Sequence, residues 1–166
     1  LDGMILLVST ETKKKQIAIS KYYTSDLPPV QIDREQIKQV FLNILLNAIE
    51  ATRENGEITV KTRPFLRPDG EPYVQIEFTD TGCGIPGEYL EDIFNPFFTT
   101  KSTGSGLGLS ISNQIIQDHS GYINVESQLS KGSSFFINLP VNQQHPKRRK
   151  SDFGNNQEIP AIFEKR

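Results

Sequence analysis

The pattern of apolar and polar positions predicts a long amphipathic helix over residues 34–54. Apolar side chains recur there at steps of three and four, and Asp33 is a suitable N-cap residue. Asn55 and Gly56 then provide a stop signal. Polar residues on the opposite stripe include Asn43 and Asn47, so these two amides stand one helical turn apart.

Five other segments have the composition and turn boundaries of strands. They cover residues 16–23, 57–67, 73–80, 122–127 and 133–139. Pro68-Asp69-Gly70 is a hairpin signal between the second and third. Short and longer helices are expected over residues 87–93 and 107–119. We expect an α+β two-layer sandwich, with a mixed, mostly antiparallel sheet of about five strands packed on about three helices.

Composition limits the domain count and the class of partner. The chain has 166 residues, 36% of them apolar, and a formal net charge of −2. One compact domain is expected, with no nucleic-acid partner and no membrane contact by this domain. The basic run 147–150 lies in a polar tail, and residues 141–166 are expected to be disordered.

Cysteine usage and hydropathy bear on the compartment. Cys83 is the single cysteine, so no internal disulfide forms and a reducing, cytoplasmic location is expected. No stretch has the roughly 18 apolar residues needed to span a bilayer. The start at Leu1 suggests an excised fragment, and a membrane anchor of the full-length protein would lie outside this chain.

A glycine-rich loop precedes the helix expected at 107–119. The sequence GSGLGLS over residues 104–110 places free backbone N–H groups at a helix N-terminus, which suits a phosphate group, although such glycines also form ordinary tight turns. A Rossmann loop directly follows a strand and a Walker loop ends in Gly-Lys-Ser/Thr, so neither pattern fits.

Two polar residues suggest recognition of a nucleotide. Asp80 follows an apolar strand in DTGCGIP, where a carboxylate accepts from the adenine amino group but is mismatched to guanine. The absent side chains of Gly82 and Gly84 would let a base approach the backbone. Asn47 offers the oxygen ligand that Mg²⁺ prefers. Taken singly, Asp80 is equally suited to a turn and Asn47 to a solvent-facing helix position.

The order of these motifs resembles that of the superfamily of histidine kinases, gyrase-type topoisomerases, mismatch-repair ATPases and heat-shock chaperones, the Bergerat fold. Residues 39–51 resemble its N box, 80–86 the G1 box, 94–98 the F box and 104–110 the G2 box. The resemblance covers residues 15–140 and is nearest to sensor histidine kinases of the nitrogen-regulation or sporulation type. Residues 1–14 would then be the end of a linker from dimerisation helices.

This resemblance implies the site residues and the cofactors ATP and Mg²⁺. Asn43, Asn47 and Lys101 are the expected catalytic residues, and Asn47 is the expected metal ligand. The expected nucleotide-binding residues are Asn47, Ala51, Asp80, Gly82, Gly84, Ile85, Phe98, Thr99, Thr100, Lys101, Gly104, Ser105, Gly106, Leu107, Gly108, Leu109 and Ser133.

The aromatic cluster and the loop after it admit two interpretations. Phe94, Phe97 and Phe98 either clamp a mobile lid over residues 99–105 or belong to the core. Glu50 stands where many sensor kinases have a basic residue. Charge compensation at the phosphates would therefore fall to Mg²⁺ and Lys101.

Asn43 separates two classes of function. Gyrase-type ATPases have a glutamate at this position to activate water, and asparagine cannot act as a base. The resemblance therefore implies transfer of the γ-phosphate to a histidine, with a conformational ATPase or an anti-sigma-factor serine kinase as alternatives. His119 and His145 are not in an acceptor motif. The expected partners are a histidine-bearing dimerisation domain, within a homodimer, and a response regulator.

Overall fold

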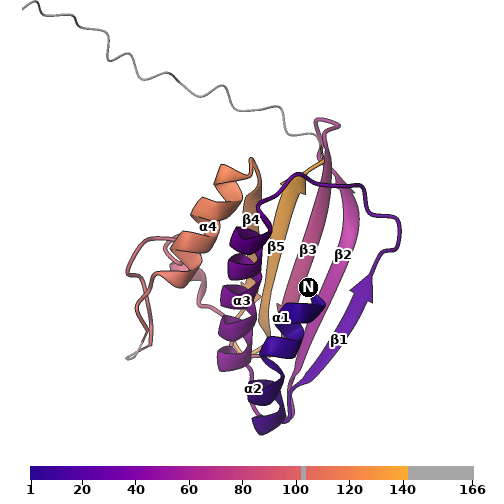
Figure 1. Ribbon diagram of the computed structural model, residues 1–166. Helices are drawn as coiled ribbons and strands as arrows, with labels where there is room; N and C mark the ends of the chain where they lie inside the picture. Colours follow the sequence, from indigo (N-terminus) through magenta and orange to yellow (C-terminus); the bar gives the residue numbers. More distant parts are fainter. Residues whose placement is uncertain (102–103, 142–166) are drawn as a thin grey trace, which may run out of the picture.

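A five-stranded sheet forms one layer of the domain. The computed structural model describes residues 1–101 and 104–141. The strands lie in the order β1-β2-β3-β5-β4 (Figure 1). Only β1 and β2 pair in parallel, and the other three pairings are antiparallel. The strands are β1 (Ala18–Tyr23), β2 (Glu57–Leu66), β3 (Pro72–Asp80), β4 (Tyr122–Gln128) and β5 (Gly132–Pro140). The expected sheet is therefore confirmed.

Helices cover one face of this sheet (Figure 1). The described residues form α1 (Asp2–Leu7), α2 (Ser9–Lys14), α3 (Arg34–Ala51), α4 (Gly108–Asp118) and a 3-10 helix, η1 (Gly87–Tyr89). The two-layer architecture is thus as predicted. Segment 87–93 contains only the short η1, followed by turns.

The N-box helix α3 begins as predicted and ends earlier. The Asp33 carboxylate accepts hydrogen bonds from the N–H groups of Glu35 and Gln36, as an N-cap does. The predicted end at residue 54 was wrong, because Thr52 adopts an extended backbone and its buried hydroxyl donates to the Ala48 carbonyl at 2.7 Å. The helix therefore ends at Ala51, and its last carbonyls have no further amides of the same helix to bond.

The core lies between α3 and the middle of the sheet. Ile44 and Leu45 on α3 are almost completely buried, as are Ile58 on β2 and Ile137 on β5. Each such side chain contributes about 1.5 to 3 kcal/mol on burial. This packing fixes the polar stripe of α3 on the side that faces away from the sheet.

Residues 1–14 form α1 and α2, which the sequence pattern did not predict as helices. Val8, between them, is 2% exposed and belongs to the core. Asp2 forms an ion pair with Lys21 of β1 at 2.8 Å. The segment therefore packs against the domain. Its assignment as the end of a linker stays a prediction.

His119 joins the two long helices and has a structural role, as expected. Its ring is buried at the end of α4, where Nδ1 donates to the Ile115 carbonyl and Nε2 accepts from the Asp33 N–H. A carbonyl only accepts and an amide only donates, so both ring nitrogens are engaged and the tautomer is fixed.

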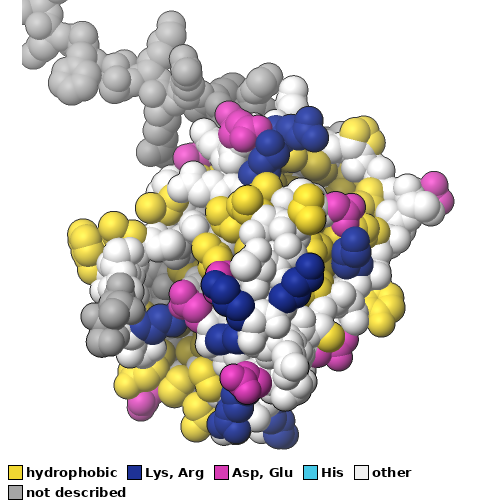
Figure 2. All heavy atoms as spheres, turned by 60° about the horizontal axis from the view of Figure 1, so that its bottom comes forward, with side chains coloured by type: hydrophobic (Ala, Val, Ile, Leu, Met, Phe, Trp, Pro, Cys, Tyr) yellow, Lys and Arg dark blue, Asp and Glu magenta, His cyan; other side chains and the backbone are white. Residues whose placement is uncertain are grey.

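The surface shows mixed charge. Basic and acidic side chains are interspersed over the face drawn in Figure 2. Within residues 1–101 and 104–141, no helix has the length and apolar content to cross a membrane. Residues 142–166, including His145 and the basic run, lie outside the described residues, so the expectation of a disordered tail is untested.

Candidate functional site

A cavity of about 370 Å³ lies where α3, the loop after β3 and the loop before α4 meet. Its walls contain every expected nucleotide-binding residue except Gly82 and Leu107. It is lined by Asn43, Leu46, Asn47, Ala48, Glu50, Ala51, Asp80, Cys83, Gly84, Ile85, Pro86, Tyr89, Ile93, Phe98, Thr99, Thr100, Lys101, Gly104, Ser105, Gly106, Gly108, Leu109, Ser133 and Phe135. Motifs up to ninety residues apart in the sequence therefore share one cavity.

Asp80 contributes a buried carboxylate to the wall of this cavity. Its side chain is 4% exposed, and Oδ1 accepts from the Gly82 N–H at 2.8 Å. Burial raises the pKa of the Asp80 carboxyl, and hydrogen bonds from the backbone of Gly82 and Ser133 oppose this shift. Ser133 lies opposite Asp80 in the pairing of β3 with β5, so the sheet holds both residues rigidly.

The two glycines after Asp80, Gly82 and Gly84, lie close to neighbouring protein backbone. A Cβ on Gly82 would lie 2.6 Å from the Ala51 backbone, and one on Gly84 would lie 2.1 Å from the Gln128 carbonyl oxygen. The absent side chains thus accommodate neighbouring protein backbone, and the expectation that they let a base approach stays a prediction. Gly82 lets the G1 loop approach the end of α3, and Gly84 lets it approach the end of β4.

Asn43 and Asn47 point from α3 toward the cavity and have different partners. The Asn43 amide nitrogen donates to the Gly108 carbonyl and to the Ser112 hydroxyl, each at 3.2 Å. The Asn47 amide oxygen accepts from the Lys101 ammonium at 3.3 Å. Asn43 therefore holds α4 to α3, whereas the oxygen of Asn47 faces a cation.

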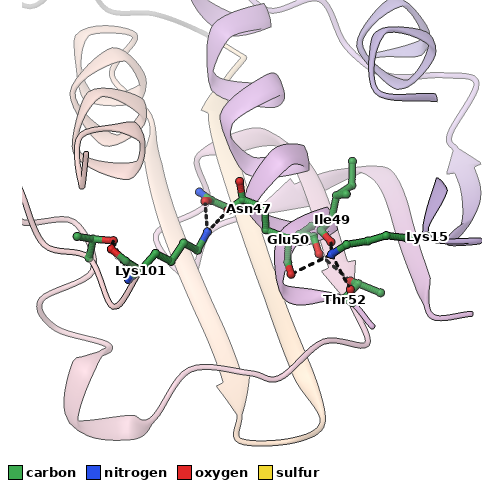
Figure 3. A network of polar contacts seen from close by, with 8 residues as sticks. Lys15, Asn47, Ile49, Glu50, Thr52 and Lys101 are labelled. Atoms are coloured by element: carbon green, nitrogen blue, oxygen red, sulfur yellow. Dashed lines mark hydrogen bonds and ion pairs between the residues drawn. The ribbon is translucent and has the colours of Figure 1, made fainter. Parts of the chain in front are cut away.

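Lys101 reaches the end of α3 from the loop that precedes α4 (Figure 3). Besides Asn47, its ammonium group contacts the Glu50 carboxylate in an ion pair. Glu50 was not among the residues predicted to bind the nucleotide, although its position was expected to lie near the phosphates. Its spacing of three from Asn47 on the same helix face was the signal that could have identified it.

The three phenylalanines of the aromatic cluster differ in their burial. Phe94 and Phe98 are partly buried against the core, and the Phe98 ring lies 5.6 Å from that of Tyr89. Phe97 is 74% exposed and has a left-handed backbone with φ of 68°. The core interpretation is therefore wrong for Phe97.

The glycine loop leads into α4 as predicted. The Phe97 N–H donates to the Gly106 carbonyl at 2.9 Å, and Gly106 has φ of 68°. A Cβ there would lie 2.4 Å from the Phe97 carbonyl carbon. Gly106 thus allows the F box and the loop to touch, and α4 starts at Gly108 with its first amides beside the cavity.

Comparison with known proteins identifies the family of this chain. Residues 32–143 match the family described as histidine kinase-, DNA gyrase B-, and HSP90-like ATPase. The chain belongs to this ATPase family. The resemblance inferred from the four boxes is therefore confirmed.

Relatives of this ATPase-family chain are sensor kinases. It is 40% identical over 144 residues to the signal transduction histidine-protein kinase AtoS of Escherichia coli, covering 87% of the chain and 23% of AtoS. It is 37% identical over 146 residues to sporulation kinase E of Bacillus subtilis, covering 88% of the chain and 19% of that kinase. The chain thus spans about a fifth of the length of these relatives.

A solved structure of a histidine-kinase catalytic domain has the same fold as this chain. The catalytic domain of the histidine kinase ThkA superposes with a TM-score of 0.73 at 37% identity, covering 84% of this chain and 89% of that one. The fold and the family of the nucleotide-binding boxes are therefore those of a histidine-kinase catalytic domain.

Proposed function

We propose that this domain binds ATP with Mg²⁺ and presents the γ-phosphate to a histidine on the dimerisation domain of the same full-length protein. The observation that carries the proposal is one cavity whose lining combines the buried carboxylate of Asp80 with Asn47, Lys101 and the glycine loop. The sensor histidine kinases among the relatives support the reaction class.

Asp80 suits the adenine end of the nucleotide. Its carboxylate already accepts from backbone N–H groups and is held by the sheet, so it is preorganised to accept from an exocyclic amino group. A guanine carbonyl at the same place would face the carboxylate oxygen without a proton between them. Adenine selectivity therefore follows from this residue.

Asn47 suits the metal. Its amide oxygen accepts from the Lys101 ammonium, and this contact with a positive group supports a cation at this position. In residues 1–101 and 104–141 no group of three or more His, Cys, Asp or Glu could hold a metal ion. Mg²⁺ bound to nucleotides takes only one or two protein ligands, so a single asparagine fits. The ion would neutralise phosphate charge.

The residues around the phosphate end favour transfer over hydrolysis. Asn43 occupies the place of a general base, yet its amide is engaged with Gly108 and Ser112 and cannot accept a proton from water. Lys101 and the first amides of α4 would stabilise negative charge on the phosphates. His119 has both ring nitrogens bonded and is not available as a nucleophile, and we place the acceptor histidine on the dimerisation domain.

The partners follow from the reaction class. ThkA is known in complex with the response regulator TrrA, and this chain shares 36% identity with that kinase at a TM-score of 0.70, covering 85% of the chain and 39% of that kinase. We infer a homodimer that receives the phosphate on its own dimerisation domain and passes it to a response regulator. A cytoplasmic location agrees with the lone cysteine.

The test combines binding with product analysis. Calorimetry of the isolated chain should give binding of Mg-ATP, with Mg-GTP much weaker and the affinity for Mg-ATP reduced in Asp80→Asn. ADP release over hours should be negligible until a histidine-bearing dimerisation domain is added, and the new phosphate should then be acid-labile. Sustained hydrolysis by the chain alone would indicate a conformational ATPase, and an acid-stable phosphate on serine would indicate a serine kinase.

A further inference from the structure

Lys15 connects the end of α2 to the C-terminal end of α3. Its ammonium group donates to the carbonyl oxygens of Ile49 at 2.7 Å, Glu50 at 3.2 Å and Thr52 at 3.2 Å (Figure 3). Its own carbonyl accepts from the Asn55 N–H at 3.1 Å. The contacts with Ile49 and Thr52 are partly buried, whereas the contact with Glu50 is exposed.

These contacts complete the hydrogen bonding of the helix end. The Ala48 carbonyl accepts from Thr52, and the Ala51 carbonyl accepts from the Cys83 N–H at 3.1 Å. Lys15 supplies the donor for the remaining end carbonyls, which is where a helix lacks internal partners and carries partial negative charge.

The same helix end holds the polar groups of the phosphate side. Asn47 and Glu50 project from the last turns of α3 and contact Lys101. Glu50 is therefore bonded twice, through its backbone carbonyl to Lys15 and through its carboxylate to Lys101. In Figure 3 the two lysines reach this point from opposite sides.

The geometry points to Lys15 as a positioning residue for the metal end of the site, coupling α2 to the placement of Asn47 and Glu50. This inference rests on the proposed function and adds a residue to it. The adenine end has an anchor that does not involve Lys15, because Asp80 is held by the Gly82 N–H and by the pairing with Ser133. Loss of the Lys15 contacts should weaken metal-dependent binding more than adenine binding.

The test measures the affinity for ATP in the presence of Mg²⁺ and again in the presence of a chelator. The ratio of these two affinities is the Mg²⁺-dependent gain in affinity. Lys15→Met keeps the aliphatic stem and removes the donor. We expect it to reduce the Mg²⁺-dependent gain in affinity by about threefold to tenfold and to leave the metal-free affinity within about twofold. Lys15→Arg, which keeps a cationic donor, should restore most of the gain.

A matched control lies one residue earlier. Lys14 is exposed and pairs only with Glu11 on α2, among the contacts of the described residues, so Lys14→Met should keep the wild-type ratio. Amide hydrogen exchange of the nucleotide-free chain provides a second readout. Exchange at residues 48–52 should accelerate in Lys15→Met and not in Lys14→Met.

The outcomes separate the two proposals. A wild-type chain without affinity for ATP contradicts the proposed function. If the wild-type chain binds ATP, either of two results for Lys15→Met overturns the role of Lys15. The first is an unchanged Mg²⁺-dependent gain in affinity, and the second is a metal-free affinity that falls in the same proportion. If Lys15→Met does not fold, Lys15→Gln takes its place. Glutamine retains a neutral donor, so we expect a smaller loss of the Mg²⁺-dependent gain in affinity. A gain equal to that of the wild type in Lys15→Gln also overturns the role of Lys15.

Discussion

The Asn43 amide nitrogen lies 3.2 Å from the Gly108 carbonyl oxygen, so the N-box helix and the first residue of α4 are joined by a side chain. In Asn43→Asp this donor becomes a carboxylate facing a carbonyl oxygen. We expect a loss of about 1 to 3 kcal/mol in the free energy of unfolding, measured by urea denaturation. The control is Gln39→Glu, an exposed neutral-to-acid change one turn earlier, which should stay within about 0.5 kcal/mol. Equal stability of the two variants would contradict the contact.

Asp80 predicts a pH-dependent stability. Burial raises the pKa of its carboxyl above the ordinary 3.8, so ionisation is less favourable in the folded chain than in the unfolded one. The protonated carboxyl of Asp80 therefore contributes stability below the ordinary pKa, and this contribution is lost as the pH rises through the raised pKa. The stability of Asp80→Asn relative to wild type should therefore increase with pH from the ordinary value upward.

Urea unfolding of both chains across this pH range measures that difference. The control is Asp26→Asn, the same change at an exposed aspartate. A difference for Asp80→Asn that stays constant with pH, or that decreases, would show that burial does not dominate at this carboxyl.

Gly106 should tolerate no side chain. Gly106→Ala combines a φ of 68° with a Cβ 2.4 Å from the Phe97 carbonyl carbon, so the loop must shift away from the F box. We expect ATP affinity to fall by at least about tenfold, because the first amides of α4 follow this loop. Gly87→Ala is the matched control, since nothing lies within 4 Å of its Cβ position. Calorimetric titration of both variants decides, and equal affinities would refute the constraint.

Lys101 should affect binding but not stability. Its ion pair with Glu50 is exposed, and such pairs contribute about 0 to 1 kcal/mol. Lys101→Met should leave the thermal midpoint nearly unchanged while ATP affinity falls by about tenfold, because a charge-assisted contact to phosphate is lost. Lys38→Met removes a comparable exposed pair with Glu35 and should change neither quantity. A large drop in the thermal midpoint of Lys101→Met would assign the residue to folding.

Much of the fold followed from local patterns. Residues of α3 were identified from apolar spacing and the Asp33 cap, and strands β2 and β3 from the turn chemistry between them, since these signals act over a few residues. The end of α3 was misplaced because the extended conformation of Thr52 depends on burial against the sheet, which no local pattern encodes.

The order of the four boxes, the family and the face of α3 that carries Asn43 and Asn47 could all be predicted from the amino-acid sequence. The pairs of groups that meet could not be predicted without the three-dimensional fold: Asn43 with Gly108, Lys101 with Glu50, and Lys15 with the end of α3. Helix and strand periodicity is a property of neighbouring residues, whereas these partners lie 34 to 65 residues apart. Their distances exist only after the core has packed the sheet and helices together.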